Sequence, residues 1–497
     1  MGQGNKNRKP RDAARNATPS LLEKIDINSA QKGSKDSVSI LGGTVRVLYW
    51  ESILSDSVRA SVTFTDAGNT LSTSKMTRRG RRPTAKKVSA VEGLPIEGSE
   101  EVYLKFADNN GVILDFGKKN NNSLYVNERK DLPTGNETTD KTYMLDLAPL
   151  EWITNEKGGY NVRKSYSGQI SDSARKILKD VLKTKKDLDI EKTSSTLDFC
   201  GNNTKPYFTL NDLATKAVRS DTRKNGETAG YFFWETSDSY HFKSIDTLMA
   251  QDYKIKILYN ESSEGIPEGY QARALSMETA NKVNVQQKLE RGAYSNAYKS
   301  IDPFSGEYTN KLYDAFKIAA GDEVKLAGVE LPALNEAFNV EEDDTEWSKV
   351  SFQLASTGQL NMGSISDQLQ NSKKLNFDGA AIFNQAKMRY NQLFASQVTI
   401  VLPGDFSLHA GDSVVVDIPQ TDITENKACG DEVDQRTSGK YLISDLCHYI
   451  TAKDTYTKLV LIRDSFGRKV ESNKGGKGEA SSNADKVMNS NFLSFLK

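Results

Sequence analysis

Cysteine, histidine and long apolar segments are all scarce in this 497-residue chain. The three cysteines lie far apart and none belongs to a C-x-x-C pair, which excludes a local zinc knuckle and favours a reducing compartment. The three histidines are equally scattered, so no metal site is expected. These six residues are Cys200, Cys429, Cys447, His241, His409 and His448.

No apolar run approaches the roughly 20 residues that cross a bilayer. The first residues carry charge without the apolar core of a secretory signal, so we expect neither a leader nor a membrane anchor. Lys plus Arg and Asp plus Glu both number 66, and the formal net charge is +0. That balance argues against wholesale binding to nucleic acid or to an acidic membrane.

Motifs of the common enzyme classes are missing as well. The sequence "GGKG" at 475–478 lacks the preceding strand and the Ser or Thr of a phosphate loop, and no Gly-x-Ser-x-Gly elbow occurs. Asp108 to Gly111 resembles a calcium loop only in composition and is interpreted as a hairpin turn. Cys447 and His448 are neighbours on a predicted strand, so their side chains point to opposite faces. We therefore predict a protein that is not an enzyme and has no cofactor.

Strand and helix patterns divide the chain. In "SVRASVTFTD" Val58, Ala60, Val62 and Phe64 alternate with polar residues, as in a half-buried strand. "VYLKFADNNGVILDF" predicts a hairpin with Asn-Asn-Gly at its turn. Helical spacing follows in "ISDSARKILKDVLKT" and "TLNDLATKAV". Strand patterns return in "QVTIVLPGD", "DSVVVDIP", "GKYLISDLCHYI" and "YTKLVLIRDSF".

This order predicts an α+β, mostly β chain in which two β domains flank a small α/β insert. A short helical turn is expected near 18–25, inside an otherwise flexible N-terminal arm. The predicted segments are the flexible arm at 1–36, the first β domain at 37–155, the α/β insert at 156–265, a continuation with a hairpin and loops at 266–344, the second β domain at 345–468, and a linker with a C-terminal docking segment at 469–497.

The stretch "AGYFFWETSDSYHFKSIDTLM", from Ala229 to Met249, places four aromatic residues in a row. Consecutive side chains of a strand point to opposite faces, so both faces of this hairpin must be covered. Stacking platforms usually interleave their rings with cations, and a membrane patch would not end at Glu235. We interpret the hairpin as a structural rib that is buried on both sides.

Two segments are candidates for binding a partner. The loop "KMTRRGRRPTAKK" holds seven cations and no acid between Lys75 and Lys87. A solvated insertion is the simple interpretation. The alternative is contact with nucleic acid or an acidic partner, and the lack of aromatic residues for base stacking weakens the nucleic-acid version. The C-terminal "KVMNSNFLSFLK" would be apolar over much of a helical surface, which favours docking into a partner's groove over packing on its own chain. The candidate residues are Arg78, Arg79, Arg81, Arg82, Val487, Met488, Phe492, Leu493, Phe495 and Leu496.

The aromatic hairpin resembles the signature region of the central baseplate hub protein of contractile-tailed bacteriophages, in the late-control, spike-hub group. Further stretches resemble the same family in the same order over about 40–468, whereas the arm, the basic loop and the tail depart from it. These stretches are "LYWESILSDSVRASVTFTDAGNT", "GLPIEGSEEVYLKF", "YSGQISDSARKIL", "FCGNNTKPYFTLNDLATKAV", "LPGDFSLHAGDSVVV" and "SGKYLISDLCHYI".

The resemblance implies that the two β domains are tail-tube-like β-barrels and that the chain forms a homotrimer. Three chains then present six tube-like domains, which matches a six-fold tail tube to a three-fold membrane-puncturing spike. The implied partners are the trimeric spike, tail-tube or tube-initiator proteins, and tape-measure and baseplate wedge proteins. DNA would only pass through the ring. The implied location is the virion tail baseplate, assembled in the host cytoplasm.

Three alternatives stay open at this stage. A hub-associated cell-wall hydrolase would use Glu235 and Asp238, which flank the turn of the aromatic hairpin, as its carboxylate pair. Ordinary turn chemistry is the favoured interpretation of that pair. An adsorption protein would bind host surface sugars through an exposed aromatic cluster. A hub of a related contractile injection system would carry the same features as a phage hub.

Overall fold

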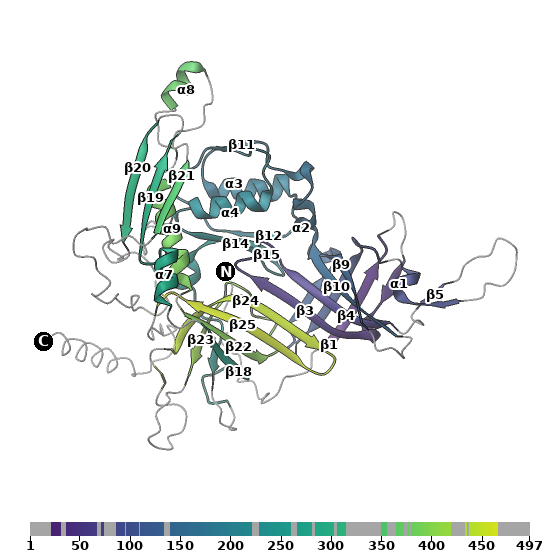
Figure 1. Cartoon of the computed structure of the whole chain (residues 1–497). Coiled ribbons are helices and arrows are strands. Elements are labelled where there is room, and N and C mark those ends of the chain that lie inside the picture. The colour runs from purple at the N-terminus through teal and green to yellow at the C-terminus, as the bar shows by residue number, and fades with distance from the viewer. Residues whose placement is uncertain are drawn as a thin grey trace, which may run out of the picture.

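The protein is described here from a computed structural model, in which β strands predominate over helices, and this confirms the predicted mostly β, α+β class. Figure 1 shows the long strands of both ends of the chain in the lower part of the molecule, with α3 and α4 above them. The structure describes residues 21–30, 36–66, 71–73, 86–94, 96–108, 110–133, 140–220, 228–259, 266–280, 284–302, 306–314, 349–354, 364–371, 376, 379–394, 396–418, 433–434 and 437–465.

One 15-stranded sheet contains strands from both ends of the chain. Its N-terminal half comprises β1 (Leu21–Asn28), β2 (Ser37–Ser39), β3 (Thr44–Ser52), β4 (Arg59–Asp66), β7 (Glu101–Ala107), β8 (Ile113–Phe116), β9 (Leu124–Leu132) and β10 (Lys141–Pro149). Its C-terminal half comprises β16 (Lys256–Leu258), β17 (Ala272–Arg273), β18 (Ser276–Ala280), β22 (Ser396–Pro403), β23 (Ser413–Asp417), β24 (Gly439–Thr451) and β25 (Thr455–Arg463).

The two halves meet where β3 pairs antiparallel with β24, from Arg46 opposite Thr451 to Ser52 opposite Asp445. Each half has its own apolar core, and the N-terminal core also includes Phe406 and Ile450 from the C-terminal half. The N-terminal half curls, since the rings of Tyr49 on β3 and Phe116 on β8 lie 5.0 Å apart across it. Among the described strands the pairing order ends at β2, β8, β17 and β18, so neither half is a closed barrel there.

Small elements decorate the N-terminal half. The predicted hairpin around Asn-Asn-Gly is present as β7 and β8. A two-stranded hairpin flanks the basic loop, whose residues 74–85 lie outside the described part. The remaining elements here are η1 (Leu41–Gly43), β5 (Leu71–Thr73), β6 (Lys86–Val88), α1 (Ala90–Gly93) and η2 (Lys118–Asn120).

The insert is a small α/β unit above the sheet (Figure 1). Its three strands run in the order β12-β15-β14, and α4 packs Leu210, Leu213 and Ala214 into the core of the unit, as the helical spacing predicted. Its elements are α2 (Leu150–Asn155), η3 (Gly158–Tyr160), β11 (Ser165–Tyr166), α3 (Ile170–Lys176), η4 (Ile177–Val181), β12 (Asp187–Ile190), β13 (Phe199–Cys200), α4 (Pro206–Lys216), β14 (Tyr231–Glu235), β15 (Ser239–Ser244) and α6 (Ile245–Ala250).

A second small sheet, in the order β20-β19-β21, stands at one side of the molecule with α8 beyond its end (Figure 1). The hairpin expected in 266–344 corresponds to β19 and β20, which pair antiparallel. The elements of this region are α7 (Val285–Arg291), β19 (Ser295–Ile301), β20 (Tyr308–Asp314), β21 (Lys349–Leu354), α8 (Ile365–Asn371) and α9 (Gly379–Leu393).

The prediction for the N-terminal arm is wrong from Leu21 onward. Instead of a flexible segment with a helical turn, Leu21–Asn28 forms β1, which pairs antiparallel with β7. The alternation is short but regular, because Ile25 and Ile27 are fully buried while Lys24 and Asp26 point away from the core. Burial of these two side chains fixes the strand and its register.

Replacing a buried side chain of β1 tests this correction. Ile25→Ala leaves a cavity in the N-terminal core and is expected to lower the free energy of unfolding by about 2–5 kcal/mol. Lys24→Ala, on the outer face of the same strand, is expected to cost much less. Chemical denaturation of both variants measures the difference. Equal and negligible losses would restore the flexible-arm prediction.

Candidate functional site at the junction of three segments

The aromatic hairpin lies between the insert and the sheet, and both of its faces are covered. Tyr231 and Phe233 belong to the core of the insert. Phe232 and Trp234 point the other way, into a cluster with Ile53 from the N-terminal half and residues of the C-terminal half. All four aromatic side chains are buried. The interpretation of the hairpin as a buried rib is confirmed.

Trp234 connects the insert to the turn that precedes β23. Its Nε1 donates a hydrogen bond to the carbonyl oxygen of Ala410 at 3.1 Å, and its indole stacks on His241 with ring centroids 4.7 Å apart. Gly411 has a φ of +89°, and a Cβ there would lie 2.6 Å from the indole Cζ2. This turn therefore requires glycine both for its conformation and for the approach of the ring.

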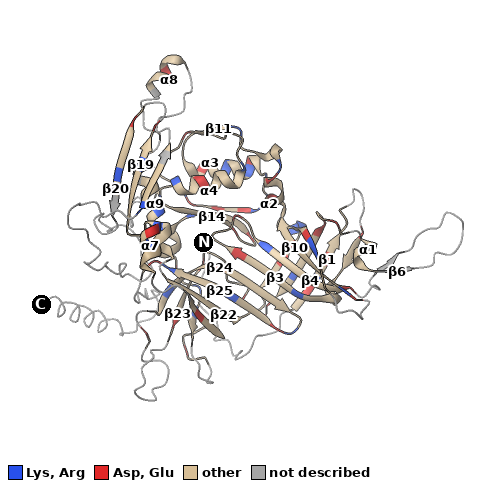
Figure 2. Ribbon diagram, viewed as in Figure 1, with Lys and Arg blue, Asp and Glu red and all other residues tan. Residues whose placement is uncertain are grey.

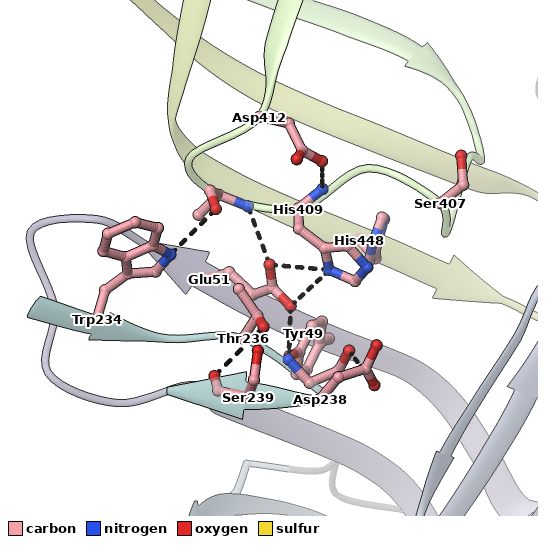
Figure 3. Close-up of polar contacts among 12 residues, drawn as sticks. Tyr49, Glu51, Trp234, Thr236, Asp238, Ser239, Ser407, His409, Asp412 and His448 are labelled. Carbon is pink, nitrogen blue, oxygen red and sulfur yellow. Dashed lines mark hydrogen bonds and ion pairs between the residues drawn. The ribbon is translucent and has the colours of Figure 1, made fainter. Parts of the chain in front are cut away.

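Glu51, near the end of β3, is the centre of the polar contacts in Figure 3. Its side chain is fully buried. Its carboxylate accepts hydrogen bonds from the backbone N–H of Ser237 at 3.0 Å and of Ala410 at 3.0 Å. The hydroxyl of Tyr49 donates at 2.8 Å, and Nδ1 of His409 lies 3.1 Å from Oε1. One carboxylate thus holds the N-terminal half, the insert and the C-terminal half.

The charge of this carboxylate is stabilised by its partners. Burial on its own raises the pKa of Glu51, but the charge of His409 and the hydrogen bonds from His409, Ala410 and Tyr49 lower it to about 2. Burial likewise opposes the charge of His409, yet Glu51 raises the pKa of His409 to about 9. At neutral pH the two groups therefore form a buried ion pair, with the imidazole about one fifth exposed.

The pKa of His448, which lies nearby, is shifted in the opposite direction from that of His409. His448 is fully buried beside Tyr49 and Phe406, and burial lowers its pKa to about 4, so it is neutral at pH 7. Cys447, its neighbour on β24, points to the other face, and burial raises the pKa of its thiol to about 11. The side chains of Cys447 and His448 thus lie on opposite faces of β24, as the sequence analysis predicted, and they do not face each other as a nucleophile and its base would.

Glu235 is a second buried carboxylate at the same junction. It forms an ion pair with Lys186 of the insert, and both side chains are almost completely buried. It also accepts a hydrogen bond from the backbone N–H of Val58 in the N-terminal half at 3.1 Å. Burial raises the pKa of Glu235, and the adjacent ammonium opposes that rise. Asp238 is exposed on the turn beyond it, so the two carboxylates proposed for a hydrolase do not face a common accessible site.

A third buried pair attaches the insert to α9. Arg389 donates from Nη1 and Nη2 to the two oxygens of Asp246 on α6, at 2.9 and 2.5 Å, and both side chains are buried. Arg389 also donates to the carbonyl oxygen of Ala229 at 3.2 Å. This bidentate geometry fixes the orientation of α9 against the aromatic hairpin. The three carboxylates together connect the insert to the N-terminal half, to the C-terminal half and to α9.

Sequence reasoning missed Glu51, His409, Asp246 and Arg389. The sequence holds little that marks these four residues. A buried acid and its cationic partner can be recognised only when the two positions are known to be close in space. The structure places the Asp108 to Gly111 stretch in the β7–β8 turn, where Asp108 accepts hydrogen bonds from the N–H groups of Asn110 and Val112. No group of His, Cys, Asp and Glu residues that suits a metal occurs among the described residues.

The predicted partner-binding residues are not tested by this structure. The four arginines of the basic loop and the six apolar residues of the C-terminal segment lie outside the described residues. They remain predictions. Among the described helices, none is both long and apolar enough to cross a bilayer.

No protein-family model and no curated protein matches the sequence. Among solved structures, the tail protein from Neisseria meningitidis MC58 is 10% identical with a TM-score of 0.45, covering 90% of this chain and 97% of that one. A 43 kDa tail protein of prophage MuSo2 from Shewanella oneidensis is 8% identical with a TM-score of 0.46, covering 89% and 99%. The E. coli c3393 protein, a type VI secretion component described as similar to T4 tail proteins gp27 and gp5, is 9% identical with a TM-score of 0.40, covering 90% and 80%.

The buried ion pair makes stability depend on pH. Because the pKa of His409 is higher in the folded protein than its ordinary value of 6.5, its stabilisation is complete below pH 6.5 and is lost as the pH rises through about 9. Wild-type protein is therefore expected to lose on the order of 2 kcal/mol between pH 6.5 and 9.5. His409→Gln should lack most of that loss in denaturant titrations at the two pH values. An unchanged pH dependence in the variant would show that His409 is neutral in the fold.

Proposed function

We propose that this chain is the hub of a contractile tail baseplate, in a bacteriophage or a related contractile injection system. In the proposal, three chains form a ring that connects a six-fold tail tube to a three-fold membrane-puncturing spike and lets DNA pass. The observation that carries it is the β3–β24 pairing, which joins β units from the two ends of one chain into one sheet with two separate cores. Twin units on one rigid chain are what this symmetry match requires.

The finer architecture belongs to the same proposal. The two halves of the sheet are proposed to be tail-tube-like barrels that extend beyond the predicted limits 37–155 and 345–468, because β1 belongs to the first half and β16, β17 and β18, from 256–280, belong to the second. The sequence resemblance over 40–468 supports this assignment. The buried carboxylates support it physically, because a ring that transmits force from tube to spike needs its two units fixed against each other.

Passage of DNA requires a wall without strong cationic patches. Figure 2 shows acidic and basic residues interspersed along the strands of both halves, and the whole chain has a formal net charge of +0. DNA would therefore pass a surface on which positive and negative side chains are mixed, and such a surface binds a polyanion only weakly. We propose that the basic loop 75–87 faces an acidic baseplate neighbour outside the channel, and that the chain acts as a structural virion component without catalysis.

The oligomeric state tests the hub function directly. Light scattering on the purified chain is expected to give three times the chain mass of 55.0 kDa, and on the chain mixed with its spike that mass plus the mass of the spike. A ring of this kind is obligate, with some 2,000 Å² or more buried at each contact. A protein that stays monomeric at micromolar concentration, alone and with the spike, would contradict the proposal.

The C-terminal segment tests the assignment of the spike contact. Deleting residues 471–497 removes Phe492, Phe495 and Leu496, whose apolar side chains are proposed to dock on the spike or an adjoining tail protein, and the spike contact is tested first. Spike binding is expected to weaken by tenfold or more in a pull-down titration, with the mass of the trimer unchanged. The triple substitution of these three residues by Ser keeps the chain length as the matched control. Full spike binding by both variants would refute the docking role.

A further inference from the structure

The small sheet β20-β19-β21 has an inverted distribution of polar and apolar side chains. Directly paired residues of neighbouring strands point to the same face. The register therefore places one set of cross-strand neighbours on the outer face of this sheet. They are Val350, Ala297 and Leu312 in one row, Phe352, Lys299 and Asn310 in the next, and Leu354, Ile301 and Tyr308 in the third.

The inner face is the polar one, and α9 covers it. Asn296 donates from Nδ2 to Oδ1 of Asn384 on α9 at 2.8 Å, and Ser351 donates to Oδ1 of Asn296 at 3.1 Å. The ring of Tyr298 lies 5.9 Å from that of Phe383. Asn296 and Ser351 are buried. The side of the sheet that meets the protein is thus largely hydrogen-bonded, whereas an ordinary half-buried sheet turns its apolar side inward.

The outer face leaves large apolar side chains accessible. Phe352 is 60% exposed, Leu354 67% and Tyr308 55%. On α8, beyond the end of the sheet, Ile365 is 85% exposed and Leu369 65%. At roughly 100 Å² for each such side chain, the face and α8 present on the order of 500–700 Å² of apolar surface. Monomeric proteins seldom leave that much uncovered, and it is close to the ~800 Å² per partner of a stable interface.

We propose that the outer face of β20-β19-β21, with α8, docks on a second copy of this chain and forms the contact between neighbouring protomers. This inference rests on the proposed trimer and assigns its interface. The exposed apolar area would supply a large share of one partner's side of such a contact, and its apolar character is that of obligate interfaces rather than transient ones. Lys299 is the single cation among the nine side chains of this face, so the face does not suit an anionic partner such as nucleic acid.

A ring does not require the face to be self-complementary. Around a three-fold axis each contact is heterologous, so one patch of a protomer meets a different patch of the next. The face stands at one side of the molecule (Figure 1), where it can reach a neighbour without rearrangement of the junction. An exposed apolar sheet is prone to aggregation. A second copy of the chain is always present during assembly and can cover the face at once.

The first experiment compares two exposed phenylalanines by light scattering on the full chain. Phe352→Glu places a charge in the proposed interface and is expected to shift the concentration for half-assembly upward by at least tenfold. Phe208→Glu is the matched control, because Phe208 is 66% exposed on α4, outside this face. An assembled Phe352→Glu variant with wild-type behaviour would overturn the assignment.

Thiol accessibility then separates the possible covers of this face. Phe352→Cys and Phe208→Cys are prepared in a Cys200→Ser, Cys429→Ser background and labelled with a maleimide over a range of protein concentrations. The thiol at position 352 is expected to react at least tenfold more slowly as the chain assembles, while the thiol at 208 keeps its rate.

Each other outcome contradicts the inference in a distinguishable way. Slow labelling at 352 at every concentration means that the chain covers this face itself. Fast labelling in the assembled ring means that the interface lies elsewhere, and the trimer of the proposed function survives. Wild-type chain that assembles neither alone nor with the spike removes the proposed function, and the assigned interface with it.

Discussion

The structure depends on a carboxylate that is kept charged inside the protein. Burying an unpaired charge costs several kcal/mol, and Glu51 avoids that cost only while Ser237, Ala410 and His409 are all in place. Those three groups come from the insert and the C-terminal half. The ionised state of one residue therefore depends on all three segments, and displacement of any of them removes part of the compensation for the buried charge.

Glu235 and Asp246 are two further buried carboxylates whose charge likewise depends on partners from other parts of the chain. Each carboxylate is buried and binds a cation, Lys186 or Arg389. Glu235 also connects the insert to the N-terminal half by accepting from the N–H of Val58, and Asp246 connects the insert to α9 through Arg389. Apolar packing alone tolerates small shifts of one unit against another, since it has no preferred direction. Hydrogen-bonded ion pairs do have a preferred direction, so these contacts favour a single relative orientation of the two β halves.

Local patterns were sufficient for much of the fold. Alternation over 102–116 predicted the β7–β8 hairpin, and four aromatic residues in a row predicted that β14 is covered on both faces. The polar junction could not be predicted from the sequence. Glu51 and His409 lie in ordinary strand and turn sequences, and only the folded structure brings them into contact. β1 was missed because only two of its side chains, Ile25 and Ile27, are fully buried, too few for a clear period.

The pairing of β3 with β24 also has a consequence for biosynthesis. β3 leaves the ribosome early, but its partner strand is translated about 390 residues later, which takes roughly 20–80 s at usual elongation rates. During that time one edge of the nascent N-terminal sheet has unsatisfied N–H and C=O groups, a template for wrong pairing. Production of this chain should therefore depend on translation speed and on chaperones that shield strand edges, more than its final stability would suggest.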